Sequence, residues 1–224
     1  MARISVVCSS KTHPIWPLLA DWTKRRGADL VDTADGLPGG DFLFLVSCGE
    51  IIPPSVRSRY RHSLVLHAGD LPRARGWSPH VWAILGGANE LTLTLLDADD
   101  PADSGAIWQQ QRIPLNGTEL CHEVNSLLFA AELELMDWAL ANCDATEPAP
   151  QIGAATFHRR RTPADSEVTP DQTLSEVFDL LRVSDPTRFP AFFNHRGARY
   201  AIRLERIASG AAGHGEVNLV CVGG

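Results

Sequence analysis

The sequence lacks several features that define common protein classes. No run of residues approaches the ~18 consecutive apolar side chains of a membrane-spanning helix, and the opening MARISVVCSSKTHPIW contains a short strand-like stretch rather than a signal peptide. Positive charge is also scarce, with 20 Lys and Arg against 27 Asp and Glu and a net charge of −7. Because affinity for phosphate backbones depends on basic residues, we expect neither a membrane protein nor a general nucleic-acid-binding protein.

Cysteine pairs and nucleotide-binding glycine motifs are missing as well. The five cysteines lie far apart, are odd in number and form no CxxC pair, so neither a disulfide framework nor a zinc site is predicted. We therefore expect a cytoplasmic location, where thiols stay reduced. The sequence has no P-loop, no GxGxxG and no GxSxG, which leaves phosphate-cradle and nucleophile-elbow chemistry without support.

The chain does contain enough apolar residues for one large domain. Of its 224 residues, 44% are hydrophobic and 21% are charged. Apolar runs bounded by turn residues predict strands at 3–8, 28–31, 41–47, 62–66 and 91–96. Helical spacing with proline and glycine signals predicts helices at 14–26, from Pro53, at 79–85 and at 118–141. This alternation predicts an α/β fold with a Rossmann-like, open, mostly parallel sheet.

The remainder of the chain is expected to form a smaller unit. Residues 145–151 contain two prolines and are typical of a linker. We predict a catalytic domain at 1–144, followed at 145–224 by the linker and a small C-terminal α+β extension. The elements predicted in this extension are a strand-like segment at 155–160, a helix at 174–182, strands at 191–194 and 199–205, and a last strand at 216–222.

A histidine and an acidic loop are the first candidates for chemistry. In an open α/β sheet, ligands bind beyond the carboxyl ends of the strands. His67 directly follows the strand at 62–66, and the loop after the strand at 91–96 contains four aspartates, of which the last is Asp103. A histidine beside a carboxylate can transfer protons near neutral pH. A purely structural role for His67 is the open alternative. The loop lacks the spacing of an EF-hand, so no metal is expected.

The segment after this strand resembles a family signature. The sequence HAGDLPRARGWSP at 67–79, followed by DSG at 103–105, is similar to the motifs of the 10-formyltetrahydrofolate-dependent formyltransferases. The segments 47–53, 161–166 and 190–193 resemble further stretches of that family, so the likeness covers about residues 1–206. The GWSP tetrapeptide resembles the short branch, which comprises sugar-nucleotide N-formyltransferases, including those for pseudaminic acid and related 4-amino sugars, and the formylation domains of peptide synthetases.

The resemblance implies an activity and a set of site residues. It implies a Rossmann-like formyltransferase fold, N10-formyltetrahydrofolate as co-substrate, no metal, and His67 and Asp103 as the catalytic pair. The residues expected to bind the folate are Val46, Cys48, Gly49, Glu50, Leu71, Arg75, Gly76, Asp97, Asp99 and Asp100. The residues expected to bind the acceptor are Lys11, His13, Trp77 and Ser78. The run 159–161 could pair with phosphates, and a solvated charge run is the open alternative.

One position departs from the family pattern, because Val65 stands where the family usually has an asparagine. In the family that asparagine contacts the formyl oxygen, so either backbone N–H groups, Ser78 or a water replace it here, or the chemistry is slower. The expected acceptor is an amino-deoxy sugar on a nucleoside diphosphate, a precursor of bacterial surface glycans. Methionyl-tRNA formyltransferases resemble the chain less, because they carry small residues in place of Trp77 and Ser78 and an added RNA-binding domain.

The sequence is also compatible with three other functions. They are a formyltetrahydrofolate hydrolase, an enzyme that formylates a carrier-bound aminoacyl group, and an inactive folate-binding relative. A homodimer is also an open alternative. Folate and a small amine are the expected partners, without nucleic acid or membrane.

Overall fold

A computed structural model describes residues 2–207 and is built around one six-stranded sheet. The strands lie in the order β2-β1-β3-β4-β6-β7. Their bounds are β1 Ile4–Val7, β2 Asp29–Val31, β3 Gly40–Val46, β4 Tyr60–His67, β6 Glu90–Asp97 and β7 Ile107–Pro114. The first four strands pair in parallel, while β6 runs antiparallel to β4 and β7 runs antiparallel to β6. The predicted mostly parallel α/β sheet is confirmed.

Helices cover both faces of this sheet. On one face lie α1 (Trp16–Arg26), α3 (Pro79–Leu85) and α4 (Cys121–Asn142), which share a large apolar core with β1, β3, β4 and β6. The other face carries a smaller core beside the short α2 (Pro54–Arg57). Burial on both faces explains why β1 and β3 are nearly uninterrupted apolar runs. None of the helices in the described part combines the length and the apolar character that crossing a membrane needs.

The antiparallel edge of the sheet was not predicted from the sequence. Strand β7 contains Gln109, Gln110 and Gln111, and most of its side chains are exposed or half-buried. An edge strand of this kind lacks the apolar run by which the buried strands are recognised. The antiparallel direction of β6 was also not predicted. An alternation of strands and helices predicts the order of the elements along the chain but not the direction of each strand in the sheet.

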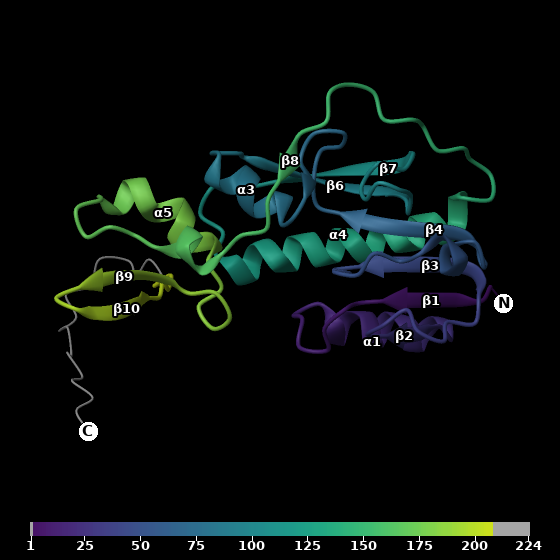
Figure 1. The fold of residues 1–224 in the computed structure, drawn as a ribbon, viewed down its shortest axis with the longest axis horizontal. Helices are drawn as coiled ribbons and strands as arrows, with labels where there is room; N and C mark the ends of the chain where they lie inside the picture. The colour runs from purple at the N-terminus through teal and green to yellow at the C-terminus, as the bar shows by residue number, and fades with distance from the viewer. Residues whose placement is uncertain (1, 208–224) are drawn as a thin grey trace.

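The C-terminal extension follows α4 through a linker. Its elements are β8 (Phe157–His158), the 3-10 helix η1 (Pro163–Ser166), α5 (Leu174–Val183), β9 (Ala191–His195) and β10 (Ala198–Ile202). Strand β8 pairs in parallel with β5 (Arg75–Gly76), and β9 and β10 form an antiparallel hairpin. Figure 1 shows α4 running alongside the strands of the sheet toward α5 and this hairpin. The strand predicted at 216–222 lies outside the described residues.

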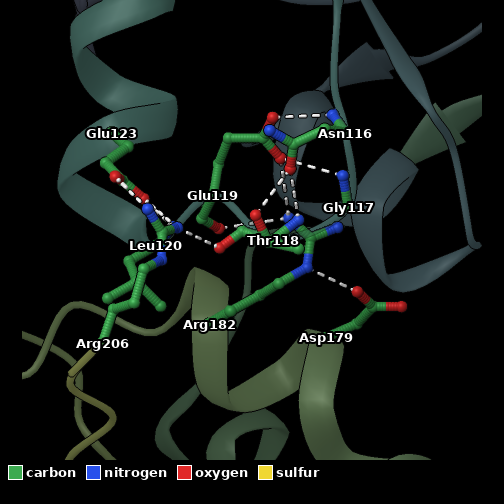
Figure 2. Close-up of polar contacts among 9 residues, drawn as sticks. All are labelled: Asn116, Gly117, Thr118, Glu119, Leu120, Glu123, Asp179, Arg182 and Arg206. Atoms are coloured by element: carbon green, nitrogen blue, oxygen red, sulfur yellow. Dashed lines mark hydrogen bonds and ion pairs between the residues drawn. The ribbon is translucent and has the colours of Figure 1, made fainter. Parts of the chain in front are cut away.

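A buried arginine joins the extension to the start of α4 (Figure 2). Arg182 of α5 is 3% exposed; its Nη1 donates to the backbone carbonyl of Glu119 at 3.2 Å, and its Nε donates to Asp179 at 2.6 Å. The Glu119 carboxylate accepts the backbone N–H groups of Asn116 and Gly117 at 2.7 and 3.0 Å. Arg206 adds an outer ion pair to Glu123 at 2.7 Å. The Arg182 contact with Glu119 holds α5 against the segment that precedes α4.

Candidate active site

His67 is the last residue of β4 and is only 7% exposed. Its Nε2 lies 2.8 Å from the carbonyl oxygen of Ala74, and its Nδ1 lies 3.4 Å from Oδ1 of Asp103. A carbonyl oxygen can only accept, so Nε2 carries a proton and donates. Nδ1 is therefore the ring nitrogen that is able to gain or lose a proton, and it does so facing a carboxylate.

Asp103 is held in place by backbone and side-chain contacts from distant segments. Its own φ is +60°, in the left-handed region that non-glycine residues adopt rarely. Its Oδ2 accepts the N–H of Gly76 at 2.9 Å, and its carbonyl accepts the side-chain amide of Gln151 at 2.9 Å. The same amide binds the carbonyl of Gly105 at 2.8 Å. Gln151 therefore stabilises the turn that contains Asp103. From the sequence, Gln151 was expected only as part of a linker.

The acidic loop reaches His67 by a route that differs from the expected one. We expected Asp103 at the carboxyl end of a neighbouring parallel strand. Strand β6 is antiparallel, and its last residue, Asp97, pairs with Leu64, three positions before His67. Arg57, which precedes β4, binds the carbonyl of Ala98 and the carboxylate of Asp100 at the start of the loop, and the loop then returns to bring Asp103 beside His67. The expected neighbourhood is present, but the topological reason for it was wrong.

His67 and Asp103 line a cavity of about 1660 Å³. Its walls fall into two groups that belong to opposite faces of the sheet. The first group, the α2 lobe, comprises Cys48, Glu50, Ile52, Arg57, Val65, Ala98, Asp99 and Asp100. The second group, the α4 lobe, comprises His13, His80, Cys121, Asn125, Leu128, Phe129 and Glu132 together with Arg161 and Arg188 of the extension. Val65 belongs to the core beside the first group and Leu66 to the core beside the second, so the end of β4, with His67, lies between the two groups.

Most of the residues proposed from the sequence line this cavity. Besides His67 and Asp103, the cavity-lining members are Cys48, Gly49, Glu50, Gly76, Asp99, Asp100, His13, Trp77 and Ser78. Cys48 is half-buried, and burial raises the pKa of its thiol, which keeps it protonated and unreactive at neutral pH. The side chains brought together are therefore suited to holding a ligand beside His67.

Five proposed residues do not line the cavity. Val46 is fully buried in the sheet, and Leu71 is buried. Lys11 forms an ion pair with Asp32 at 3.1 Å. Asp97 accepts the indole N–H of Trp108 at 2.7 Å, and Arg75 donates to Gln151 at 2.6 Å. These contacts give each of the last three a local structural partner.

The extension contributes cationic side chains to the site, of which Arg188 and Arg199 were not proposed from the sequence. The guanidinium of Arg160 lies 4.8 Å from the ring centre of Trp77, and that of Arg199 lies 4.1 Å from the ring centre of Phe192. Arg160, Arg188 and Arg199 line the cavity, and within residues 2–207 none of them lies within 4 Å of a carboxylate. The run 159–161 was noticed in the sequence, but its arginines could not be assigned to the cavity without the fold.

Two further histidines in the α4 lobe are held neutral. Burial and the nearby Arg188 lower the pKa of His13 to about 4. Burial, His67, His13 and Arg161 lower the pKa of His80 to about 4. Both imidazoles are therefore uncharged near pH 7 and can each donate one hydrogen bond and accept another. His80 was missed in the sequence, because nothing distinguishes it from a polar residue in the first turn of a helix.

The fold and the site together define a Rossmann-like α/β protein with a histidine–carboxylate pair at the end of a central strand. The family model described as "Formyl transferase" matches residues 20–139, which is more than half of the chain. The chain belongs to the formyl transferase family.

Individual relatives differ in what their names say they act on. A methionyl-tRNA formyltransferase of Thermodesulfovibrio yellowstonii is 26% identical over 149 residues, which cover 65% of this chain and 48% of the relative. The chain thus spans about half the length of such curated relatives. The structure of a methionyl-tRNA formyltransferase from Clostridium thermocellum matches with a TM-score of 0.78 and 21% identity, covering 93% of this chain and 95% of that one. A sugar N-formyltransferase from a Shewanella species matches with a TM-score of 0.68 and 18% identity, covering 92% of this chain and 99% of that one.

Proposed function

We propose that this protein transfers a formyl group from N10-formyltetrahydrofolate to the primary amine of an amino sugar carried on a nucleoside diphosphate. The observation that carries the proposal is the His67–Asp103 pair at the junction of a two-lobed cavity. Two lobes that meet at a proton-transfer group suit a reaction between two bound substrates. A hydrolase would need room for only one of them.

The α2 lobe is the proposed site of the folate. Its wall contains the loop at 48–50 and the loop at 98–100, whose backbone groups can read the edge of a pterin ring. Apolar side chains such as Ile52 and Val65 complete a surface that suits a flat heterocycle. When bound there, the folate supplies the activated formyl group, while the chain's own residues position it and move the proton.

His67 is the proposed proton acceptor. An ammonium group has no free electron pair, so its proton must leave before or during attack. With Nε2 fixed on the carbonyl of Ala74, Nδ1 is the atom that accepts this proton. The carboxylate of Asp103 at 3.4 Å then stabilises the imidazolium.

Ser78 is the proposed donor to the formyl oxygen, in place of the missing asparagine at Val65. Two backbone N–H groups of this turn are already engaged, since Gly76 donates to Asp103 and Trp77 donates to the carbonyl of His158. Ser78 lines the cavity, and its hydroxyl has no hydrogen-bond partner within the described residues. A hydroxyl in this position can stabilise the charge that develops on the oxygen.

The acceptor class follows from the arginines of the extension. Arg160, Arg188 and Arg199 face the cavity without carboxylate partners, in a chain whose net charge is −7. Guanidinium groups bind phosphate oxygens with directed, charge-assisted hydrogen bonds. The side chain of Trp77, 43% exposed, offers a flat apolar surface for a sugar or a base. A nucleoside-diphosphate sugar combines these groups in one molecule.

A second candidate acceptor is methionyl-tRNA. The names of the curated relatives favour it, and the same arginines could contact a phosphate backbone. One competition experiment separates the two. The protein is incubated with labelled formyl donor, methionyl-tRNA and a panel of UDP-, GDP- and dTDP-linked amino sugars in one tube. Label in a sugar nucleotide supports the proposal, and label in methionyl-tRNA alone contradicts it. Release of tetrahydrofolate without any amine would indicate a hydrolase.

A further inference from the structure

Helix α4 presents one stripe of side chains to the cavity. The stripe follows helical spacing and consists of Cys121, Val124, Asn125, Leu128, Phe129 and Glu132. Glu132 is the acidic member and is only 4% exposed. Its Oε2 is shielded from solvent without a hydrogen-bond partner, and no described residue forms a hydrogen bond with either of its oxygens.

The fold itself gains nothing from a carboxyl group at this position. Leu128, Leu135 and Met136, which lie near it on the helix, are buried and apolar. A leucine or methionine at 132 would continue this surface, whereas an unpaired buried polar group lowers stability. Buried polar groups without partners are rare and call for an explanation. If Glu132 binds a ligand in the cavity, this function explains why a carboxyl group that lowers stability stands here.

Two uncharged rings, those of His13 and His80, lie in the same lobe as Glu132, together with the cationic Arg161 and Arg188. The ring of His13 lies 5.8 Å from the ring of Phe129, which precedes Glu132 by about one helical turn. His80 lines the same lobe, and its Nδ1 is also buried without a partner. Burial raises the pKa of Glu132 to about 8. Near pH 7 this wall therefore presents a protonated carboxyl and neutral imidazoles, each of which can both donate and accept.

Such a wall complements the hydroxyl and amide groups of a sugar ring. A sugar presents several uncharged donors and acceptors at once, and a protonated carboxyl can bind two of them. A phosphate would instead be bound by the arginines that line the cavity, which are Arg161 and Arg188 in this lobe and Arg160 and Arg199 beyond it. We propose that Glu132 is a specificity-determining residue that hydrogen-bonds a hydroxyl or amide group of the acceptor sugar in the α4 lobe. This inference rests on the proposed function.

Three variants test the role of Glu132 with the amino-sugar nucleotide that the wild type formylates best. Glu132→Leu removes both hydrogen bonds and should raise the acceptor KM about 10-fold. Glu132→Gln keeps a donor and an acceptor and should stay within about 3-fold of wild type. The KM for the formyl donor should not change in either variant. Glu134→Leu is the matched control, because Glu134 lies on the same helix but is exposed and outside this cavity.

Thermal unfolding shows whether the variants are folded, and Glu132→Leu should melt at or above the wild-type temperature. An unchanged acceptor KM in folded Glu132→Leu would overturn the inference and leave the proposed function standing. A loss in Glu132→Gln as large as that in Glu132→Leu would also overturn it, because it would show that the group acts through charge.

A binding measurement separates failure of this inference from failure of the proposed function. If the wild type formylates no amine in the panel, the proposed function fails. Glu132 is then tested by calorimetric binding of UDP-N-acetylglucosamine. Weaker binding in Glu132→Leu but not in Glu134→Leu supports the role in sugar binding. Equal binding by both variants, or no binding by the wild type, overturns it.

Discussion

At the scale of single residues, His67 is the position where activity should be most sensitive. Replacing it with Asn puts an amide, which accepts no proton near neutral pH, in place of the imidazole and should lower kcat by at least about 10²-fold, because positioned proton-transfer groups contribute 10²–10⁴. Folate binding should persist, because His67 lies at the junction of the lobes rather than within the α2 lobe. Single-turnover kinetics and folate-binding titration measure the two effects. Turnover near that of wild type would refute the assignment.

Glu132 should also leave a signature in the pH dependence of stability. Its folded-state pKa is raised to about 8, whereas an unfolded glutamate has a pKa of 4.5. Between these values the folded state holds a proton that the unfolded state has released, so this residue lowers stability as pH rises. Relative to Glu132→Gln, the wild type should lose up to about 1.4 kcal/mol of unfolding free energy per pH unit in that window. Urea denaturation at pH 5, 6.5 and 8 measures this difference. If the unfolding free energies of wild type and Glu132→Gln changed with pH in parallel, the carboxyl of Glu132 would already be ionised in the folded protein at pH 5.

At the scale of elements, the turn after β6 depends on a glycine. A Cβ added to Gly105 would lie 2.0 Å from the carbonyl oxygen of Asp97, so the backbone would have to move. That movement would displace Asp103 from His67, and small misplacements of catalytic groups can reduce rates about 10²-fold. We expect Gly105→Ala to reduce kcat by this order.

The control for this prediction is Gly86→Ala at the end of α3. There the nearest atom would be 3.3 Å from the new Cβ, and the backbone φ is −84°. Both variants are compared by kcat and by circular dichroism. Equal activity in the two would show that the turn is not the element that positions Asp103.

The contact between α5 and the start of α4 should contribute strongly to the stability of the fold, although it lies far from His67. Arg182→Ala leaves Glu119 and Asp179 without their buried partner and should reduce stability by about 2–4 kcal/mol. Arg206→Ala removes an exposed pair and should cost less than about 1 kcal/mol. Denaturant midpoints measure the stability of both variants. Similar losses of stability in Arg182→Ala and Arg206→Ala would contradict the importance assigned to the burial of Arg182.

The same elements show how far the sequence alone could lead. The buried strands and the long helix are predictable, because their apolar spacing reflects the burial that they have in the fold. The direction of β6 and the existence of β7 are not, because a polar edge strand carries little periodic signal. His67 and Asp103 could be recognised from a motif. Gln151 and Glu132 could not, since the first depends on the path of a linker and the second on which way α4 is rotated.

At the scale of the whole molecule, charge is distributed unevenly. The chain carries a net charge of −7, yet Arg160, Arg188 and Arg199 gather on the cavity wall without carboxylate partners in the described region. Replacing any one of them with Ala should raise the KM for a nucleoside-diphosphate acceptor about 5- to 10-fold, since each removes a charge-assisted contact. The folate KM should not change.

Salt provides an independent measurement of the same arginines. The acceptor KM of the wild type should rise between 50 and 300 mM salt, and this rise should be smaller in the triple alanine variant. Arg59→Ala serves as control, because Arg59 lies outside the cavity. A salt response identical in wild type and triple variant would show that these arginines do not contact the phosphates.

The attachment of the extension has an evolutionary consequence. Residues 156–202 supply the arginines of the cavity wall and meet the sheet-bearing part of the chain through the β5–β8 pair, the packing of α5 against α3 and α4, and the Arg182 contacts. The proton-transfer pair and the α2 lobe belong entirely to the other part of the chain. Selection can therefore remodel this segment as long as β8 keeps its pairing with β5, because Gly76 of β5 donates to Asp103. We expect chimaeras that exchange the part of this segment after β8 between homologues to change which amines are accepted while His67 and Asp103 stay in place.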